Sequence, residues 1–566
     1  MRKITTMGAA AVLALLAFLP LSLRAVELNE VDVTLLPQLV GRGNGYTEIG
    51  FSLTNRSPEV KQVGLTLEAA YNYGRGLNRL SRKVTLPPES SMKVSLWQPP
   101  LAMNNPQLTI EVNGRVFTPD KHNLQPGTSG NFGRNTVILL SQQVPGNSGK
   151  FYQGPAGSYS GGIEYQMSSM PVAQWSKYAL AYSGVPMIML TGRDWKEMPE
   201  EVKNALLQYA DLGGVILLIG VEAPERAVLL NEYWRRENVG FGYLLYSSIE
   251  PEAFSESDWQ YLERDWQRFQ NTVNDNAMKN SGNLFRALLS IDSNNFPAVP
   301  LMLVMVVFAI IVGPVNYIVL MRRKRLMLLL VTTPLISLVF AGLIVGYAFV
   351  AEGWGIQQGI HSMTYLDEIR QQAATIGNMG IYGAVSPDGL KFSEAMELRF
   401  GEGTADSGYL QIDDSAGQLL TGSWFVPRLP GAIAFRKAEN RLERLKINPL
   451  ADGSLEVVNG LGGEITFLAI KMPDRKAYES ATPLPGGARA VLWPKEGGGV
   501  SREFELRDNF LHGWNSFRQP SAEQLPAGNY YAELVASPFI ETGFEAGKLS
   551  QKAAVFGHFA EEEKTK

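Results

Sequence analysis

The chain has 566 residues, of which 45% are hydrophobic and 19% charged, and its net charge is −4. At roughly 150 residues per domain this length predicts three or four units, and the negative charge argues against a nucleic-acid-binding surface. There is no cysteine, which excludes disulfides, a thiolate nucleophile and cysteine-ligated metals. The histidines are far apart in sequence, so no metal or cofactor is predicted and each is interpreted as an ordinary structural or surface residue: His122, His361, His512 and His558.

The N-terminus has the pattern of a secretory signal peptide. Residues 1–3 are basic at positions 2 and 3, an apolar run covers 7–23, and Ala25 provides a small residue at the boundary. We predict a signal peptide over 1–25 that is cleaved after Ala25, with an uncleaved signal anchor as the alternative. Either interpretation places the residues that follow outside the cytoplasm.

Residues 26–125 alternate between apolar and polar side chains, as strands do. Asn113-Gly114, between two such runs, is a good two-residue hairpin turn. About a hundred residues of short alternating strands predict a β-sandwich of the immunoglobulin or fibronectin type III kind. No catalytic chemistry is evident in this segment.

The pattern changes over 126–290. Continuous apolar runs at 136–140, 187–190 and 215–219 indicate strands buried on both faces of a sheet. Between the last two, Pro199 opens a helix that Gly213-Gly214 closes, which completes a strand–helix–strand unit. A later apolar stripe at helical spacing is interpreted as core packing and not as a ligand site: Trp259, Leu262, Trp266 and Phe269.

Candidate site residues in this region are carboxylates at the ends of predicted strands. Asp194, Glu197, Glu200 and Glu222 could serve as general acids or bases there, where α/β sites usually lie. Acidic residues at a helix start also complement the helix dipole, which explains Glu197 and Glu200 without a function. We therefore keep Asp194 and Glu222 as weak ligand-site candidates. The glycine patterns at 154–162 and 240–242 lack the features of nucleotide sites and are read as turns.

Two long apolar runs at 297–350 predict a transmembrane helical hairpin. Each run exceeds the ~20 residues needed to cross a ~30 Å hydrocarbon core, and a turn at 321–325 joins them. The turn carries four consecutive cations, which the positive-inside rule places in the cytoplasm: Arg322, Arg323, Lys324 and Arg325. The export signal independently places the preceding residues outside.

Within the first predicted span, Gly313-Pro314 should kink the helix, and Asn316 follows near its cytoplasmic end. Polar groups inside a membrane usually find a partner, so Asn316 could bond the second helix or another subunit. The alternative is that Asn316 satisfies a backbone carbonyl freed locally by Pro314.

The remainder, 370–566, is predicted to be a second extracytoplasmic β domain. Residues 351–380 link the hairpin to it, with a short helix expected over Tyr365 to Thr375, and β alternation begins near Gly380. The segment 424–428 is read as a buried aromatic strand, with a surface recognition loop as the alternative. The overall fold class is multidomain α/β plus β: an N-terminal β-sandwich, a flavodoxin-like α/β domain, a two-helix hairpin and a C-terminal β-sandwich.

The segment 180–220, with its apolar strand, acidic loop, helix and Gly-Gly-strand-Gly ending, resembles the class I glutamine amidotransferase-like fold. Together with Gly313-Pro314-Val315-Asn316-Tyr317 in the hairpin, the chain is similar to poorly characterised bacterial membrane proteins that combine these domains. The enzymes of the amidotransferase family place a cysteine nucleophile after a strand and activate it with a histidine–glutamate pair. Here 220–224 follows the third strand, cysteine is absent, and 126–296 contain no histidine. The resemblance therefore implies a noncatalytic relative.

These observations predict a noncatalytic scaffold or binding protein of the cell envelope, anchored in the bacterial inner membrane with most of its mass in the periplasm. The expected partners are the membrane and other envelope or membrane proteins, with homo-oligomerisation as a further option; no nucleic acid is expected. Two alternatives stay open: a hydrolase or amide-transfer enzyme built on the α/β domain, and an accessory subunit of a transport or secretion complex.

Overall fold

The computed structural model divides the chain into two compact units. The first comprises 1–273, 391–397 and 407–422, and the second comprises 274–390, 398–406 and 423–566. The structure describes residues 26–40, 45–70, 76–119, 136–144, 163–255, 257–258, 262, 288–289, 298–352, 355–401, 404, 409–495 and 525–560. The predicted signal peptide, the glycines at 154–162, His122, His512 and Trp259, Trp266 and Phe269 of the predicted stripe lie outside these residues. Leu262 of that stripe is described and is buried in the core.

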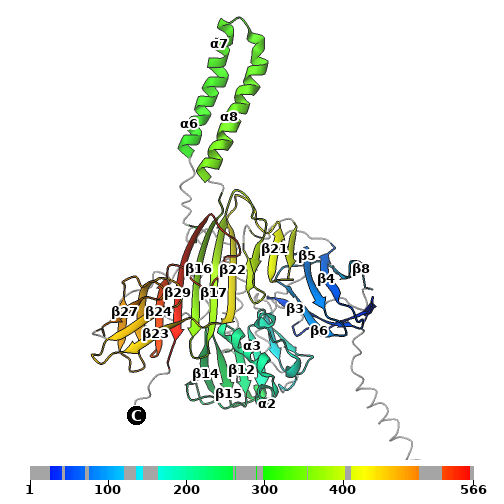
Figure 1. The fold of residues 1–566 in the computed structure, drawn as a ribbon, viewed down its shortest axis with the longest axis vertical. Coiled ribbons are helices and arrows are strands. Elements are labelled where there is room, and N and C mark those ends of the chain that lie inside the picture. The colour runs from blue at the N-terminus through cyan, green and yellow to red at the C-terminus, as the bar shows by residue number, and fades with distance from the viewer. Residues whose placement is uncertain are drawn as a thin grey trace, which may run out of the picture. The chain divides into compact units, whose positions relative to one another are not determined.

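The first unit contains a β-sandwich-like pair of sheets (Figure 1). Side chains alternate between buried and solvent-facing along the strands, and Ile49, Phe51 and Leu53 of one strand are completely buried. One sheet has the order β1 (Val26–Leu28), β2 (Val31–Leu35), β3 (Thr47–Asn55), β6 (Ser91–Gln98). The other has the order β18 (Leu390–Phe392), β21 (Gln418–Gly422), β20 (Leu410–Asp413), β5 (Arg79–Leu86), β4 (Lys61–Ala69), β7 (Pro106–Val112), β8 (Arg115–Phe117).

Three strands of that second sheet come from beyond the apolar hairpin, which the predicted boundaries 26–125 and 370–566 did not anticipate. β20 pairs with β5 in parallel, with Ile412 opposite Leu80, and β21 and β18 follow outward. The added strands cover an edge of β5 that would otherwise expose unpaired backbone groups. A period of two identifies a strand but does not identify its neighbour, so the sequence pattern alone could not predict this pairing.

The predicted hairpin turn at Asn113-Gly114 is confirmed. β7 and β8 pair directly across it, with Val112 opposite Arg115. Both turn residues have positive φ, 48° and 82°, as a type I′ turn requires.

The rest of the first unit is an α/β domain whose sheet has the order β10 (Ile163–Met167), β9 (Thr136–Leu140), β11 (Met187–Thr191), β12 (Val215–Ile219), β15 (Gly242–Ser247), β14 (Trp234–Val239), β13 (Val228–Leu229). The pairs from β10 to β15 are all parallel, which confirms the three predicted buried strands. β14 and β13 are antiparallel, and Gly240-Phe241 forms the turn into β15 as predicted.

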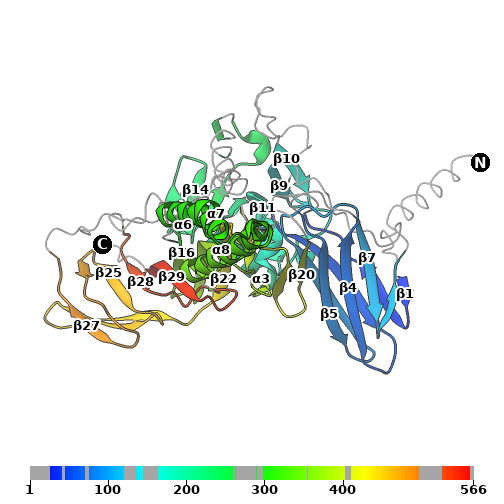
Figure 2. The same cartoon turned by 90° about the horizontal axis from the view of Figure 1, so that it is seen from above.

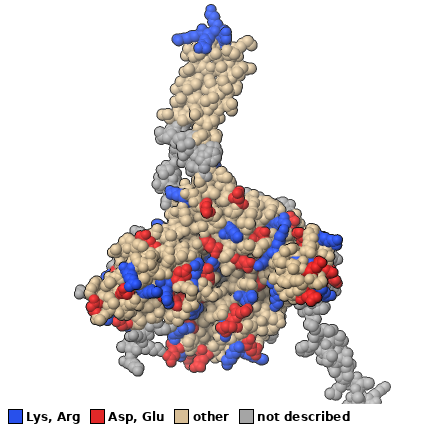
Figure 3. Space-filling model, viewed as in Figure 1, with Lys and Arg blue, Asp and Glu red and all other residues tan. Residues whose placement is uncertain are grey.

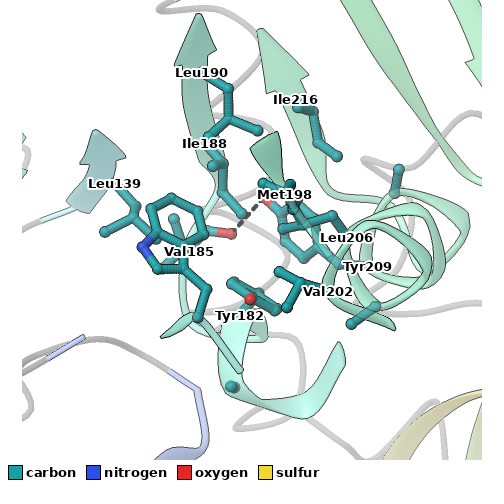
Figure 4. Close-up of a cluster of buried hydrophobic side chains, with 14 of the residues drawn as sticks. Leu139, Tyr182, Val185, Ile188, Leu190, Met198, Val202, Leu206, Tyr209 and Ile216 are labelled. Carbon is teal, nitrogen blue, oxygen red and sulfur yellow. Dashed lines mark hydrogen bonds between the residues drawn. The ribbon is translucent and has the colours of Figure 1, made fainter. Parts of the chain in front are cut away.

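The link between β11 and β12 contains α2 (Gly192–Glu197) and α3 (Glu200–Asp211), with Pro199 at the N-cap of α3 as predicted. The buried face of α3 packs through Val202, Leu206 and Tyr209 against β11 and its neighbours (Figure 4). The Tyr209 hydroxyl donates a hydrogen bond to the backbone oxygen of Val185 at 2.8 Å. Figure 2 shows the α/β domain and the strands of the sandwich from a second direction.

The second unit contains an eight-stranded sheet with the order β19 (Glu397–Phe400), β22 (Gly431–Asn440), β17 (Gln372–Tyr382), β16 (Gln357–Asp367), β29 (Lys548–His558), β28 (Asn529–Leu534), β25 (Ile465–Lys471), β26 (Ala477–Ser480). A three-stranded sheet, β23 (Arg444–Pro449), β24 (Leu455–Gly460), β27 (Arg489–Leu492), shares a hydrophobic core with it. This core includes Leu366, Leu455 and Val555.

The predicted helix over Tyr365 to Thr375 is wrong. These residues lie in the β16–β17 hairpin, where Thr364 pairs with Thr375 and Asp367 with Gln372. The Asp367 carboxylate accepts hydrogen bonds from the backbone of Ile369 and Arg370 and closes the turn. Pairing along two eleven-residue strands overrides the local helix preference of this segment.

Trp424 and Phe425 are buried, at 0% and 3% exposure, so the surface-loop alternative is wrong for these two side chains. They lie between β21 and β22 and not within either strand, and Phe425 makes an isolated bridge to Thr404. Burial was therefore predicted correctly, and regular strand structure was not.

The apolar hairpin consists of α6 (Ala298–Ile310), a π-helical turn (Ile311–Val315), α7 (Asn316–Arg322), a short 3-10 turn (Leu326–Leu328) and α8 (Leu329–Glu352). Residues 302–322 and 326–346 are each long and apolar enough to cross a membrane. At 1.5 Å per residue, 21 residues extend about 31 Å, close to the thickness of the hydrocarbon core.

Candidate functional site

The carboxyl edge of the parallel sheet holds Asp194, the first of the two weak candidates. Asp194 lies in the first turn of α2, directly after β11, and its side chain is 1% exposed. It forms a capping box with Thr191: the Thr191 hydroxyl accepts the backbone N–H of Asp194, and the Thr191 backbone N–H donates to Asp194 Oδ2 at 2.8 Å.

The same oxygen of Asp194 also joins two neighbouring strands. Ser141, at the end of β9, donates its hydroxyl to Oδ2 at 2.5 Å, and the Thr191 hydroxyl donates at 2.8 Å. Three donors therefore converge on one carboxylate oxygen. Because these contacts hold the helix start and the strand end together, Asp194 has a structural role that accounts for its burial.

The other three carboxylates do not form a catalytic pair with Asp194. Glu222 is exposed in the segment after β12, and within the described residues no hydrogen bond connects it to Asp194. Glu197 pairs with Arg193 at 2.6 Å, and this hydrogen bond lowers the pKa of Glu197 instead of raising it toward neutrality. Glu200 contacts Lys203 at 3.5 Å on the helix surface.

The different surroundings of the two candidates predict different effects on stability. Asp194→Asn should destabilise the α/β domain by about 1–3 kcal/mol, because an amide oxygen is a weaker acceptor than a carboxylate oxygen for the three converging donors, and the amide brings an NH2 group into a buried site. Glu222→Gln should stay within about 0.5 kcal/mol of the wild type, as exposed substitutions usually do. Chemical unfolding measures the change in stability that each substitution causes, and hydrogen exchange of α2 shows whether the change is local. Equal effects of the two substitutions would contradict the structural role of Asp194.

The hairpin holds the remaining candidates. Pro314 lies inside the π-helical turn Ile311–Val315, which interrupts the first helix between α6 and α7. Proline has no N–H to donate and clashes with the preceding turn, and a π-helical turn accommodates both effects. The irregularity therefore lies at the predicted position, Gly313-Pro314.

Asn316, immediately after this turn, is hydrogen-bonded to the second helix. Its amide donates to the Thr332 hydroxyl at 3.0 Å and to the Thr333 hydroxyl at 3.4 Å, while the Thr332 hydroxyl donates back to Asn316 Oδ1 at 3.1 Å. Of the two interpretations of Asn316, the structure contains the bond to the second helix. Thr332 and Thr333, polar residues in an apolar run, are the sequence signal for this partner.

Removing this contact should loosen the hairpin. Asn316→Leu is expected to cost about 0.6–1 kcal/mol of helix association, the typical value of an interhelical hydrogen bond in an apolar environment. Thr332→Val should have a similar effect because it removes the same reciprocal bond, and Thr333→Val a smaller one. The change in helix association can be measured by SDS titration. A donor and an acceptor fluorophore are attached to cysteines that replace Leu303 and Leu343, both of which are exposed. A larger effect of Thr333→Val than of Thr332→Val would contradict this assignment.

The four cations Arg322, Arg323, Lys324 and Arg325 are all exposed at the turn of the hairpin, where Figure 3 shows blue atoms above a tan surface.

Two buried titratable groups have shifted pKa values: Asp414, which the sequence did not indicate, and His361, which was interpreted as an ordinary histidine. Asp414 in the turn between β20 and β21 is completely buried, and desolvation raises its pKa to about 7. His361 in β16 is buried, and its pKa is lowered to about 4, mainly by desolvation and to a smaller extent by the charge of Lys552. Within the described residues, no cluster of three or more acidic or histidine side chains could hold a metal ion.

Comparison with models of known protein families gives no match, and neither does comparison with curated proteins. The fold defines the class of protein: a β-rich multidomain chain with two helices suited to a membrane.

Proposed function

We propose that this chain is a noncatalytic scaffold or binding protein of the bacterial cell envelope. The apolar hairpin anchors it in the inner membrane, and its β domains and α/β domain lie on the periplasmic side. There it holds other envelope or membrane proteins together in a complex. The α/β domain, in this proposal, is a degenerate relative of the class I glutamine amidotransferase-like fold.

The observation that carries the proposal is the apolar surface of the hairpin. Large aliphatic side chains cover its outer faces, including Leu330 at 85%, Leu338 at 71% and Met302 at 66% exposure. Soluble monomers rarely expose an apolar surface of this extent, so it requires either lipid or protein around it. Both helices match the thickness of a bilayer, which favours lipid.

The noncatalytic assignment is supported by how the α/β domain uses its polar groups. The buried carboxylate at the carboxyl edge, Asp194, is engaged with Ser141 and Thr191 in holding the fold together. Glu222 is exposed and has no described hydrogen-bonding partner. No described histidine lies in this domain to activate Ser141.

Topology can be tested with single cysteines because the chain has none of its own. Val60→Cys, in the sandwich, replaces a residue that is 51% exposed, and Arg323→Cys replaces an exposed residue within the cationic turn. In spheroplasts of a Gram-negative host, a membrane-impermeant maleimide should label Cys at 60 directly and Cys at 323 only after permeabilisation. Labelling of both in intact spheroplasts, or extraction of the protein by alkaline carbonate, would contradict the proposed anchoring.

The scaffold role is tested by extraction of the tagged protein in mild detergent, followed by mass spectrometry of the proteins that remain bound. A reproducible, stoichiometric membrane or envelope partner is expected. A monodisperse protein without a partner would contradict the scaffold role. Reaction with a hydrolase activity probe that is lost in Glu222→Gln would instead favour an enzyme on the α/β domain.

A further inference from the structure

The turn of the hairpin ends α7 with a Schellman motif. The backbone N–H of Arg325 donates to the Leu320 oxygen at 3.0 Å, and that of Lys324 donates to the Met321 oxygen at 3.0 Å. Lys324 is the first residue after the C-cap, and its backbone is in the left-handed region with a φ of 53°. Glycine is preferred at this position because a Cβ is unfavourable there. Lysine is therefore present at a position whose backbone conformation favours glycine.

The turn also concentrates charge for which the described part of the chain provides no ion pair. Lys324 is flanked by Arg322, Arg323 and Arg325, and all four side chains are exposed. Among the described residues no ion pair involves any of them, and the sequence from 293 to 351 contains no aspartate or glutamate. Charge at the end of α7 complements the helix dipole, but that effect is small and confined to the last turn, so it does not account for four cations.

Apolar side chains lie directly on both sides of the cations. Met321 and Leu326 are 47% and 46% exposed, and Met327 is 93% exposed. An apolar belt in contact with a cluster of cations matches the boundary between hydrocarbon and headgroups. At that depth long basic side chains extend toward lipid phosphates while the adjacent methionine and leucine side chains stay in the acyl region.

We propose that this turn, residues 322–325, is a binding surface for the phosphate groups of anionic phospholipids in the leaflet that it reaches. The inference rests on the proposed membrane anchoring and adds a partner of defined chemistry to it. Arginine offers several donors to one phosphate, and lysine adds a compact charge within the turn. An acidic surface alone would match only the cations, whereas a lipid offers both phosphate groups for the cations and acyl chains for the flanking Met327, so the lipid is favoured.

Lipid preference can be measured on the full-length protein in bicelles of phosphatidylcholine that contain either spin-labelled phosphatidylglycerol or spin-labelled phosphatidylcholine. Each cation near an anionic surface contributes about fivefold to binding at low salt. The wild type should prefer the anionic label by at least about tenfold, and rising salt should reduce the preference. The variant R322Q/R323Q/K324Q/R325Q should show no preference.

Lys324 separates lipid binding from folding. Lys324→Gly relieves the left-handed conformation and removes one charge, so the hairpin should be at least as stable as the wild type while the anionic preference falls about fivefold. Lys324→Arg keeps the charge and the conformational cost, and should retain the wild-type preference. An unchanged preference in both Lys324→Gly and the four-residue variant would overturn the proposal.

The outcomes also separate this inference from the proposed anchoring. If the protein enters bicelles and shows correct cysteine topology but has no anionic preference, lipid recognition is wrong and anchoring stands. If the four-residue variant keeps its lipid preference but loses a co-purifying acidic protein, the turn is a protein-binding surface and the lipid proposal is overturned. Failure to enter bicelles removes the basis of both.

Discussion

Asp414→Asn is expected to stabilise the protein more as the pH rises. The difference in free energy of unfolding between the variant and the wild type should grow by about 4 kcal/mol between about pH 4 and pH 8. Asp414 is completely buried in the turn that follows β20, one of the strands contributed from beyond the hairpin. Its Oδ2 accepts the backbone N–H of Trp97 at 2.9 Å, which connects this turn to β6. Its Oδ1 has no hydrogen-bonding partner among the described residues.

Burial without full hydrogen bonding makes the ionised form of Asp414 unfavourable in the folded state. Desolvation raises the pKa from 3.8 to about 7, the Trp97 N–H and Arg82 oppose this, and the charges of Glu394 and Asp413 add to it. The difference of about three pKa units, at about 1.4 kcal/mol each, gives the expected value.

The direction of the pH dependence follows from which state holds the proton. Between the unfolded pKa near 4 and the folded pKa near 7, the folded protein binds more protons than the unfolded chain, so wild-type stability falls as the pH rises. Below this window the buried Asp414 is protonated and costs no free energy of ionisation. Above it, that cost is present in full and no longer changes with pH. Asparagine carries no charge at any pH and removes the contribution, although its NH2 group lacks an acceptor and lowers the gain equally at every pH.

Chemical unfolding of the first unit at several pH values, with hydrogen exchange of β20 and β6 as a local probe, measures this effect. Asp413→Asn is the matched control, because Asp413 is one residue away, only half-buried and bonded to Ser415. Removing the Asp413 charge should lower the pKa of Asp414 slightly, because that charge is the smallest of the causes of the shift, and the pH dependence should otherwise match that of the wild type. An Asp414→Asn profile parallel to that of the wild type would show that Asp414 does not titrate in this window.

Gly242→Ala is expected to destabilise the α/β domain by about 3 kcal/mol. Gly242 begins β15, where the strand passes the end of α3. A Cβ at this position would lie 2.2 Å from the Gly214 oxygen and 2.4 Å from the Ala210 oxygen. These are backbone atoms, so no side chain can rotate to make room, and β15 or α3 must shift.

The consequence should be visible where the two elements meet. Hydrogen exchange should increase in α3 and β15, together with a lower midpoint in chemical unfolding. Gly486→Ala is the control, because its φ is in the ordinary range and no atom lies within 4 Å of the added Cβ. It should change stability by less than about 0.5 kcal/mol. Equal stability of the two variants would contradict the close packing of α3 on β15.

Several features of this protein follow from the sequence alone because they depend on neighbours along the chain. Continuous apolar runs predicted the buried parallel strands β9, β11 and β12, and Pro199 with Gly213-Gly214 predicted the limits of α3. Asn113-Gly114 predicted a type I′ turn. The two long apolar runs predicted helices suited to a membrane, and Gly313-Pro314 predicted the irregularity within the first.

Candidate sites were predicted less well. The sequence located Asp194 at a strand end, but its role depends on Ser141, more than fifty residues earlier, which only the parallel pairing of β9 with β11 brings close. Asp414 was not predicted, because nothing in its surrounding sequence distinguishes a buried aspartate from one in an exposed turn.

Only the tertiary structure decided the partners of the strands. The sequence of 357–382 is compatible with more than one local structure, and pairing between its two halves selected the β16–β17 hairpin over the predicted helix. The strands within 390–422 cover the edge of β5 from beyond the hairpin. Periodicity along a chain determines which face of a segment is apolar, whereas the choice of neighbour depends on which edges remain unpaired once the other segments have folded, and that information is distributed over the whole chain.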